Sequence, residues 1–194
     1  YQLHTGYVPS GSVKHPSFGS LVAQQIADEN AELPSVVAVG RTEGAGFLGV
    51  DYEPFVVDNP GQIPQNVGTR QSADRFERRL GLLSQLDQEF AQRGARSAVE
   101  NHRQLYDKAS KLVLSPQTKT FDFSDESAAT REKYGNSTFG RGCLLARRLV
   151  ETGVPFVEVR SDGWDTHDDV FARVSNIASQ VDPGAAALLD DLSQ

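Results

Sequence analysis

The residues best suited to chemistry are concentrated in one short loop near the C-terminal end of the chain. The segment SDGWDTHDD contains Asp162, Trp164, Asp165, His167, Asp168 and Asp169. Carboxylate oxygens and a neutral imidazole nitrogen are ligands for zinc, manganese and similar divalent ions, and a loop containing glycine can bring them together. Acidic residues are also common at helix starts, so Asp165 or Asp168 could instead cap the following helix, with His167 a hydrogen-bonded loop residue. The spacing alone leaves both interpretations open.

The other reactive residue types give less specific signals. His4 and His15 stand beside turns containing Gly or Pro, where a lone histidine is more often a surface residue than a ligand. Cys143 is the only cysteine, which excludes a disulfide within the chain and a thiolate metal cluster. Its leucine neighbours predict an apolar helix face, where a free cysteine acts as a small buried hydrophobe. The glycines of residues 44–49 are not followed by a convincing helix, so they do not indicate a phosphate-binding loop.

The elements that must position the acidic loop alternate between strand and helix. Short runs rich in β-branched residues predict strands at 35–39 (SVVAV) and 155–160 (PFVEVR), the second leading directly into the loop. Apolar residues at helical spacing predict helices over 17–29, 139–152 and 169–192, the last one capped and restarted at Asp182-Pro183. This alternation predicts an α/β fold of three layers, with both strands in one mainly parallel sheet that is flanked by these three helices. Loops at the carboxyl ends of such strands are where open sheets bind ligands.

The middle of the chain shows a different pattern. Residues 40–71 contain many glycines and prolines without periodicity, which is typical of a functional loop or one that wraps a neighbouring surface. Residues 72–114 predict two helices separated at Gly94, with Ser72 as the N-cap of the first. We expect these helices to form an antiparallel hairpin that projects from the sheet or packs across its edge.

Composition restricts the class of protein. With 194 residues, 38% hydrophobic and 23% charged, the chain has the composition of a globular domain. The formal net charge of -7 argues against a nucleic-acid partner, because neutralising phosphates requires a basic face. No apolar run approaches the roughly 20 residues of a membrane span. Small molecules, metal cations and other proteins remain as expected partners.

Several segments resemble one protein family. The run YGNSTFGRGCLLARRLVETGVPFVEVRSDGWDTHDDVFARV at 134–174 is similar to the uncharacterised bacterial family known as domain of unknown function 1501. The segments LLDDL at 188–192, YQLHTGYVP at the start of the chain, and HPSFGSLVA after it resemble that family too. The resemblance implies the sulfatase-like, alkaline phosphatase superfamily, whose fold is a large αβα sandwich around a divalent-metal site. It also implies hydrolysis of a small anionic phosphate or sulfate ester.

The same resemblance suggests metal ligands. It implies that Asp165 and His167 bind a divalent ion, with zinc, manganese, calcium and magnesium as the candidates. One residue lies between the two, where many members of the superfamily have three. This difference bears on the assignment of His167 and leaves Asp162, Asp168 and Asp169 as substitute ligands.

The resemblance also implies that residues 1–194 are the middle portion of one alkaline-phosphatase-like domain, with residues 72–114 inserted as a helical hairpin. On this expectation the nucleophile and a second Asp/His cluster lie outside the chain, and the remainder of the protein or another chain completes the sheet. Export to the periplasm or cell surface is implied, with no signal segment in this chain. The alternative is a non-catalytic binding or assembly protein, in which the hairpin and residues 40–71 form a partner surface.

Overall fold

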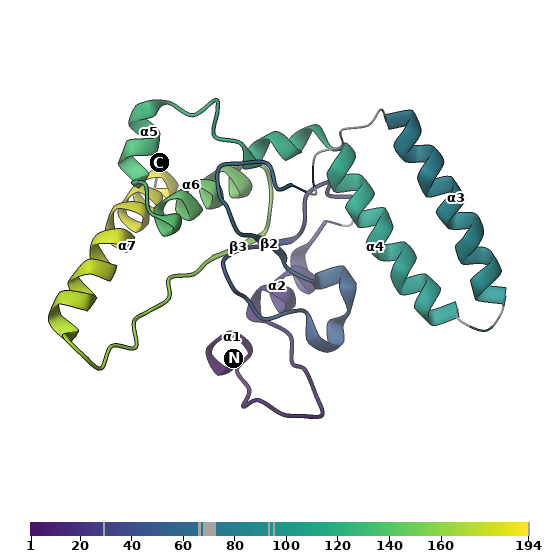
Figure 1. Ribbon diagram of the computed structural model, residues 1–194, viewed down its shortest axis with the longest axis horizontal. Helices are drawn as coiled ribbons and strands as arrows, with labels where there is room; N and C mark the ends of the chain where they lie inside the picture. The colour runs from purple at the N-terminus through teal and green to yellow at the C-terminus, as the bar shows by residue number, and fades with distance from the viewer. Residues whose placement is uncertain (29, 66, 68–72, 93, 95, 194) are drawn as a thin grey trace.

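A small parallel sheet lies at the centre of the fold (Figure 1). The computed structural model describes residues 1–28, 30–65, 67, 73–92, 94 and 96–193. The strands β1 (Val36–Val39), β2 (Phe55–Val57) and β3 (Phe156–Val159) are arranged in the order β2-β1-β3, and both pairs are parallel. All four residues of β1 are buried, as expected for a central strand covered on both faces. The prediction that residues 35–39 and 155–160 share one parallel sheet is confirmed, whereas β2 lies within the segment predicted to be a loop.

Helices cover both faces of the sheet. On one face, α2 (Phe18–Ile26) packs so closely that a Cβ atom at Gly19 would lie 2.6 Å from the ring of Phe156. On the other face is α6 (Thr138–Glu151), where a Cβ atom at Gly142 would lie 2.7 Å from Cγ1 of Val159. Positions 156 and 159 point to opposite faces of β3 because side chains alternate along a strand. The structure is therefore a three-layer α/β arrangement around three strands.

The last helix takes a different place from the one predicted. Instead of flanking the sheet directly, α7 (Val170–Leu192) packs mainly against α6 and α5 (Ala128–Tyr134). The face of the sheet on that side is already covered by α6. Contact between the helices is close, since a Cβ atom at Gly184 would lie 2.6 Å from Cα of Gly140. The predicted restart at Asp182-Pro183 is also wrong: Pro183 removes one backbone hydrogen bond, yet the packed helix continues through it.

The middle of the chain forms the expected helical hairpin. The two helices are α3 (Ala73–Gln92) and α4 (Arg96–Leu114), which pack against each other. Between them, Gly94 has a φ of 103°, a conformation that glycine adopts without the steric cost other residues would pay. The predicted N-cap at Ser72 lies outside the described residues. Figure 1 shows α3 on the outer side of the hairpin, while α4 packs against the 3-10 turn η2 (Val50–Tyr52).

The hydrophobic core lies between the sheet, α6 and the segment before α5. Its largest fully buried side chains include Tyr134, Phe121, Leu144, Leu145, Leu149, Val37 and Val57. The remaining elements are short: α1 (Gln2–Thr5), η1 (Gly46–Leu48) and η3 (Pro116–Phe121). In the part of the chain that the structure describes, no helix combines the length and apolar character needed to span a membrane.

Candidate functional site

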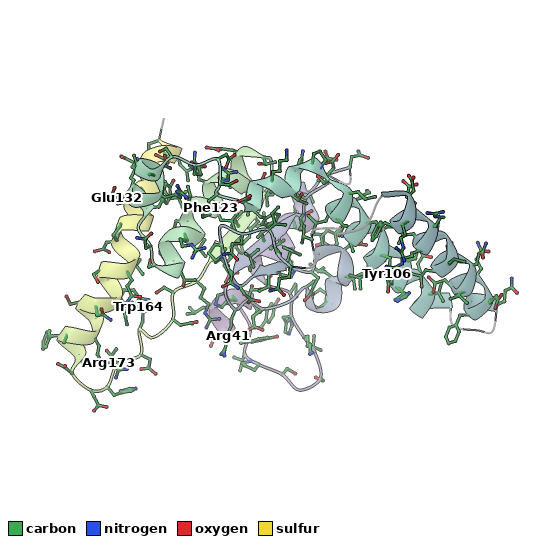
Figure 2. All side chains as sticks on the ribbon, turned by 45° about the horizontal axis from the view of Figure 1, so that its top comes forward. Arg41, Tyr106, Phe123, Glu132, Trp164 and Arg173 are labelled. Carbon is green, nitrogen blue, oxygen red and sulfur yellow. The ribbon has the colours of Figure 1, made fainter. Side chains whose placement is uncertain are left out.

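The two predicted metal ligands contact each other on the extended segment between β3 and α7. Nε2 of His167 lies 2.9 Å from Oδ1 of Asp165, and the two side chains are 82% and 89% exposed. Trp164 of the same segment is half exposed and donates a hydrogen bond to a neighbouring serine (Figure 2). Catalytic zinc sites generally use three protein ligands. The structure therefore brings Asp165 and His167 together, but as an exposed contact between two side chains rather than as a complete coordination shell.

The remaining acidic residues of this loop do not extend the pair. Oδ1 of Asp162 accepts a hydrogen bond from Nε of Arg160 at 2.8 Å. Asp169 occupies the N-cap position of α7 with a φ of 47°, and its side chain makes no cap hydrogen bond. The capping interpretation thus fails for Asp165 and Asp168, because neither residue is at the N-cap of α7.

The strand order places a topological switch point at the carboxyl ends of β1 and β3. From β1 the chain continues to β2 on one side, while β3 lies on the other side and leads away to α7. Open α/β sheets bind ligands in the crevice at such a topological switch point. An open cleft of about 720 Å³ lies along this edge, and its lining includes His4, Phe18, Glu158, Arg160, Asp162 and Asp165.

Glu158 is the best-positioned polar residue of this cleft. Its side chain is 18% exposed, and its Oε1 lies 3.0 Å from Nδ1 of His4. The other oxygen, Oε2, accepts a hydrogen bond from Oγ1 of Thr42 at 3.0 Å. Within the described part of the chain, the buried Oε1 accepts no hydrogen bond. It lies close to Nδ1 of His4, but the two atoms do not have hydrogen-bond geometry. Buried polar atoms are normally satisfied, and Oε1 is therefore a candidate to bind a ligand.

Three local features bring these side chains together. Alternation along β3 places Glu158 on the same face as Phe156, which packs against α2. Thr42 follows β1 after Gly40, whose φ of 97° turns the chain away from the strand end. His4 belongs to the single-turn helix α1, near the start of the chain.

A second depression, of about 580 Å³, adjoins the cleft on the side of β2. It is lined by Gly40, Arg41, Thr42, Glu43, Val56, Asp58, Arg160 and Asp162. Arg160 and Asp162 line both hollows, and Figure 2 labels Arg41 at this edge. Together the two hollows contain five carboxylates, at positions 43, 58, 158, 162 and 165, but only two guanidinium groups. The excess negative charge favours a cation at this edge.

The donor atoms of this edge fit a divalent cation in type but not in number. Carboxylate and imidazole groups suit zinc, manganese, calcium or magnesium. Among the described residues, however, no three His, Cys, Asp or Glu side chains are grouped closely enough to hold an ion. Two pairs are present, Glu158 with His4 and Asp165 with His167. Each pair supplies part of a coordination shell that needs further ligands.

A comparison with protein-family models gives a match along the whole chain. The model described as "Protein of unknown function (DUF1501)" matches residues 1–194. The chain belongs to this family. No curated protein and no solved structure matched it. The DUF1501 match covers the hairpin of α3 and α4 as well as β3 and the loop that follows it.

Sequence reasoning on this DUF1501 chain missed Glu158 and Thr42. A signal for Glu158 was present, because a charged residue in the middle of a short apolar strand is costly unless it finds a partner. Nothing in the local sequence marks Thr42, which joins the site only through the pairing of β1 with β3. The sequence indicates His4 only as a lone histidine near a turn and does not reveal its contact with Glu158.

The other candidate residues, His15, His102 and Cys143, contact neighbouring protein side chains or lie in the core. The imidazole of His15 stacks on Tyr7 with 3.8 Å between ring centroids. The helical His102 lies 3.5 Å from a carboxylate oxygen of Asp87, which joins α4 to α3. Cys143 is buried in α6, and this burial raises the pKa of its thiol to about 11. The Cys143 environment agrees with the predicted role as an inert core residue.

Proposed function

We propose that this DUF1501 chain carries the ligand-binding cleft of a sulfatase-like hydrolase that acts on small phosphate or sulfate esters with the help of a divalent cation. The observation that carries the proposal is the meeting of His4, Thr42 and Glu158 at the switch point between β1 and β3. This is where open parallel sheets bind ligands. The resemblance of residues 134–174 to DUF1501 proteins, and through them to sulfatase-like enzymes, adds support for the reaction class.

Charge explains why this cleft would require a cation. An anionic ester approaching an edge rich in carboxylates is repelled, and a bound divalent ion would reverse that repulsion and polarise the ester. We propose that Glu158 and His4 hold the ion in the cleft, and that Asp165 and His167 form a separate pair on the loop after β3. Each pair needs further ligands, because no three such side chains are grouped among the described residues. Arg41 is suited to contact the ester oxygens, because guanidinium groups bind such anions through paired hydrogen bonds.

The proposed enzyme requires more of the sheet than these three strands. In the described part of the chain, β3 pairs with β1 alone, so its outer edge presents unpaired backbone groups. We propose that further strands, from the remainder of the same protein or from another chain, extend the sheet there into the αβα sandwich of the alkaline phosphatase superfamily. The nucleophile is not assigned to any residue of this chain.

Metal binding by matched variants tests the proposal. The purified protein is titrated with zinc, manganese, calcium and magnesium, and hydrolysis of p-nitrophenyl phosphate and p-nitrophenyl sulfate is measured with each ion. Replacing a ligand should weaken metal affinity by at least about tenfold, as loss of even a supporting residue does. We expect this loss in Glu158→Gln and Asp165→Asn. The control is Glu132→Gln, which removes an exposed carboxylate on α5 away from the cleft (Figure 2).

Two results would overturn the proposal. The first is unchanged metal affinity in both Glu158→Gln and Asp165→Asn. The second is a wild-type protein that binds none of the four ions and hydrolyses neither ester. A non-catalytic binding protein is the second candidate, because the same acidic edge would attract a cationic organic ligand directly. Binding of a polyamine, lost in Glu158→Gln, together with absence of metal would favour that candidate.

A further inference from the structure

The outer helix of the hairpin carries an exposed apolar stripe. Leu82, Leu86 and Phe90 of α3 are spaced by four residues, so their side chains lie along one side of the helix. Their exposed fractions are 63%, 63% and 60%. Single exposed leucines are ordinary on a protein surface, but a continuous apolar row is typical of a contact surface.

This stripe is distinct from the surface that α3 uses to pack on α4. The partly buried residues of α3 include Phe76, Leu80, Leu83 and Asp87, which follow another side of the helix. Asp87 marks the inner side, because its Oδ1 lies 3.5 Å from Nδ1 of His102 in α4. Successive helical residues are rotated by about 100°, so Leu86 points well away from the direction of Asp87. The stripe therefore remains open after the hairpin has formed.

The charges beside the stripe are arranged with opposite signs at its two ends. Arg78 and Arg79 precede the stripe, and Glu89 lies within its last turn. Among the residues that the structure describes, neither Arg79 nor Glu89 forms an ion pair within the chain. A helix that is basic toward one end and acidic toward the other complements a copy of itself running in the opposite direction.

We propose that this stripe binds the same stripe on a second copy of the chain, with the two α3 helices antiparallel about a two-fold axis. In an antiparallel pair of identical helices, the residue numbers of two positions that face each other always give the same sum. Placing Leu82 against the partner's Leu86 therefore also places Arg79 against the partner's Glu89, and Arg78 against the ring of the partner's Phe90. One register thus brings together the leucines and the opposite charges, and the two-fold axis repeats every contact. The two hairpins together would form a four-helix bundle.

The apolar part of the proposal is tested by the oligomeric state in solution. Sedimentation equilibrium of the full chain over a range of concentrations should show a reversible dimer. Leu86→Lys should make the protein monomeric at concentrations where the wild type dimerises. The matched control is Leu189→Lys, which changes an equally exposed leucine of α7 (67% exposed) and should leave the dimer intact. Circular dichroism would show that helix content is unchanged in both variants.

The charge part is tested by reversal and mixing. We expect two variants to weaken the dimer: the single variant Glu89→Arg and the double variant Arg78→Glu with Arg79→Glu. Each should raise the dimer dissociation constant by about tenfold or more, because an attractive contact becomes repulsive at both symmetry-related positions of the dimer. Mixing these two variants should restore association, since each then presents the charges that the other lacks. A wild-type protein that is monomeric at all concentrations overturns the proposal. So does a dimer unaffected by Leu86→Lys, and so does failure of the mixed variants to associate.

Discussion

Oε1 of Glu158 in β3 lies 3.0 Å from Nδ1 of His4 in α1, although the two residues stand near opposite ends of the chain. The contact joins the N-terminal segment to the edge of the sheet, and the hydrogen bond from Thr42 adds the end of β1. Partly exposed pairs of this kind contribute at most about 1 kcal/mol to stability. The contacts of Glu158 with His4 and Thr42 matter more for position, because they hold three distant segments of the chain at one cleft.

Loss of this contact should loosen the N-terminal segment. In Glu158→Gln, we expect trypsin to cleave after Lys14 about fivefold faster than in the wild type, because about 1 kcal/mol less is needed to open the segment locally. Mass spectrometry of short digests measures the rate. Glu132→Gln should match the wild type, and an unchanged rate in Glu158→Gln would show that the contact does not hold the segment.

The glycine contact between α6 and α7 should be sensitive to a single methyl group. A Cβ atom at Gly184 would lie 2.6 Å from Cα of Gly140, so Gly184→Ala must displace a helix. We expect a loss of about 1–3 kcal/mol in the free energy of unfolding, measured in urea. Gly81→Ala is the matched control in α3, where a Cβ atom would meet nothing within 4 Å. It should leave the protein unchanged or stabilise it by up to about 1 kcal/mol, and equal effects of the two substitutions would contradict the packing argument.

The thiol of Cys143 should be unreactive in the folded protein. Burial raises its pKa from 9.0 to about 11, which lowers the thiolate fraction about a hundredfold at neutral pH. Labelling with a thiol-reactive disulfide reagent at pH 8 should therefore be slow under native conditions and rapid in guanidinium chloride. Labelling of the native protein as fast as that of the unfolded protein would mean that α6 does not cover this residue.

The carboxylate of Asp191 should make stability depend on pH in the acidic range. The side chains of Lys133 and Tyr134 each donate a hydrogen bond of 2.8 Å to this carboxylate. These bonds lower the pKa of Asp191 below its usual value, and the bond from Lys133 has the largest effect. A lowered pKa in the folded state stabilises the protein above the unfolded-state value of about 3.9, and this contribution is lost as the pH falls through the folded-state pKa.

We therefore expect Asp191→Asn to destabilise the protein at pH 7 and to have a smaller effect near pH 2. Urea unfolding at both pH values, on the wild type and the variant, measures the difference. Glu151→Gln is a suitable comparison, because Glu151 is more exposed and, among the described residues, forms an ion pair only with Arg147 of its own helix. A difference between the wild type and Asp191→Asn that does not change with pH would contradict the ionic role of Asp191.

Much of the secondary structure followed from local sequence. Apolar residues at helical spacing predicted α2, α6 and the hairpin of α3 and α4, and the runs SVVAV and PFVEVR predicted β1 and β3. These signals are local because a helix or a buried strand must present apolar side chains at its own repeat. The three residues of β2, Phe-Val-Val, are of strand-forming type, but the run is shorter than the about four to eight residues of a recognisable strand and is surrounded by prolines and glycines. Pairing with β1 is what makes them a strand.

The sequence by itself determined the DUF1501 resemblance, the placement of β1 and β3 in one mainly parallel sheet, and the acidic character of the loop that follows β3. Only the tertiary structure decided which polar side chains meet. Asp165 and His167, two positions apart in sequence, remain an exposed pair, whereas His4, Thr42 and Glu158 come together from three separate segments. The physical reason is that residue type and spacing describe one segment at a time, while a site depends on strand order and on the helices that pack over it. The same reason applies to α7, which packs against α6, with Gly184 close to Gly140, instead of flanking the sheet.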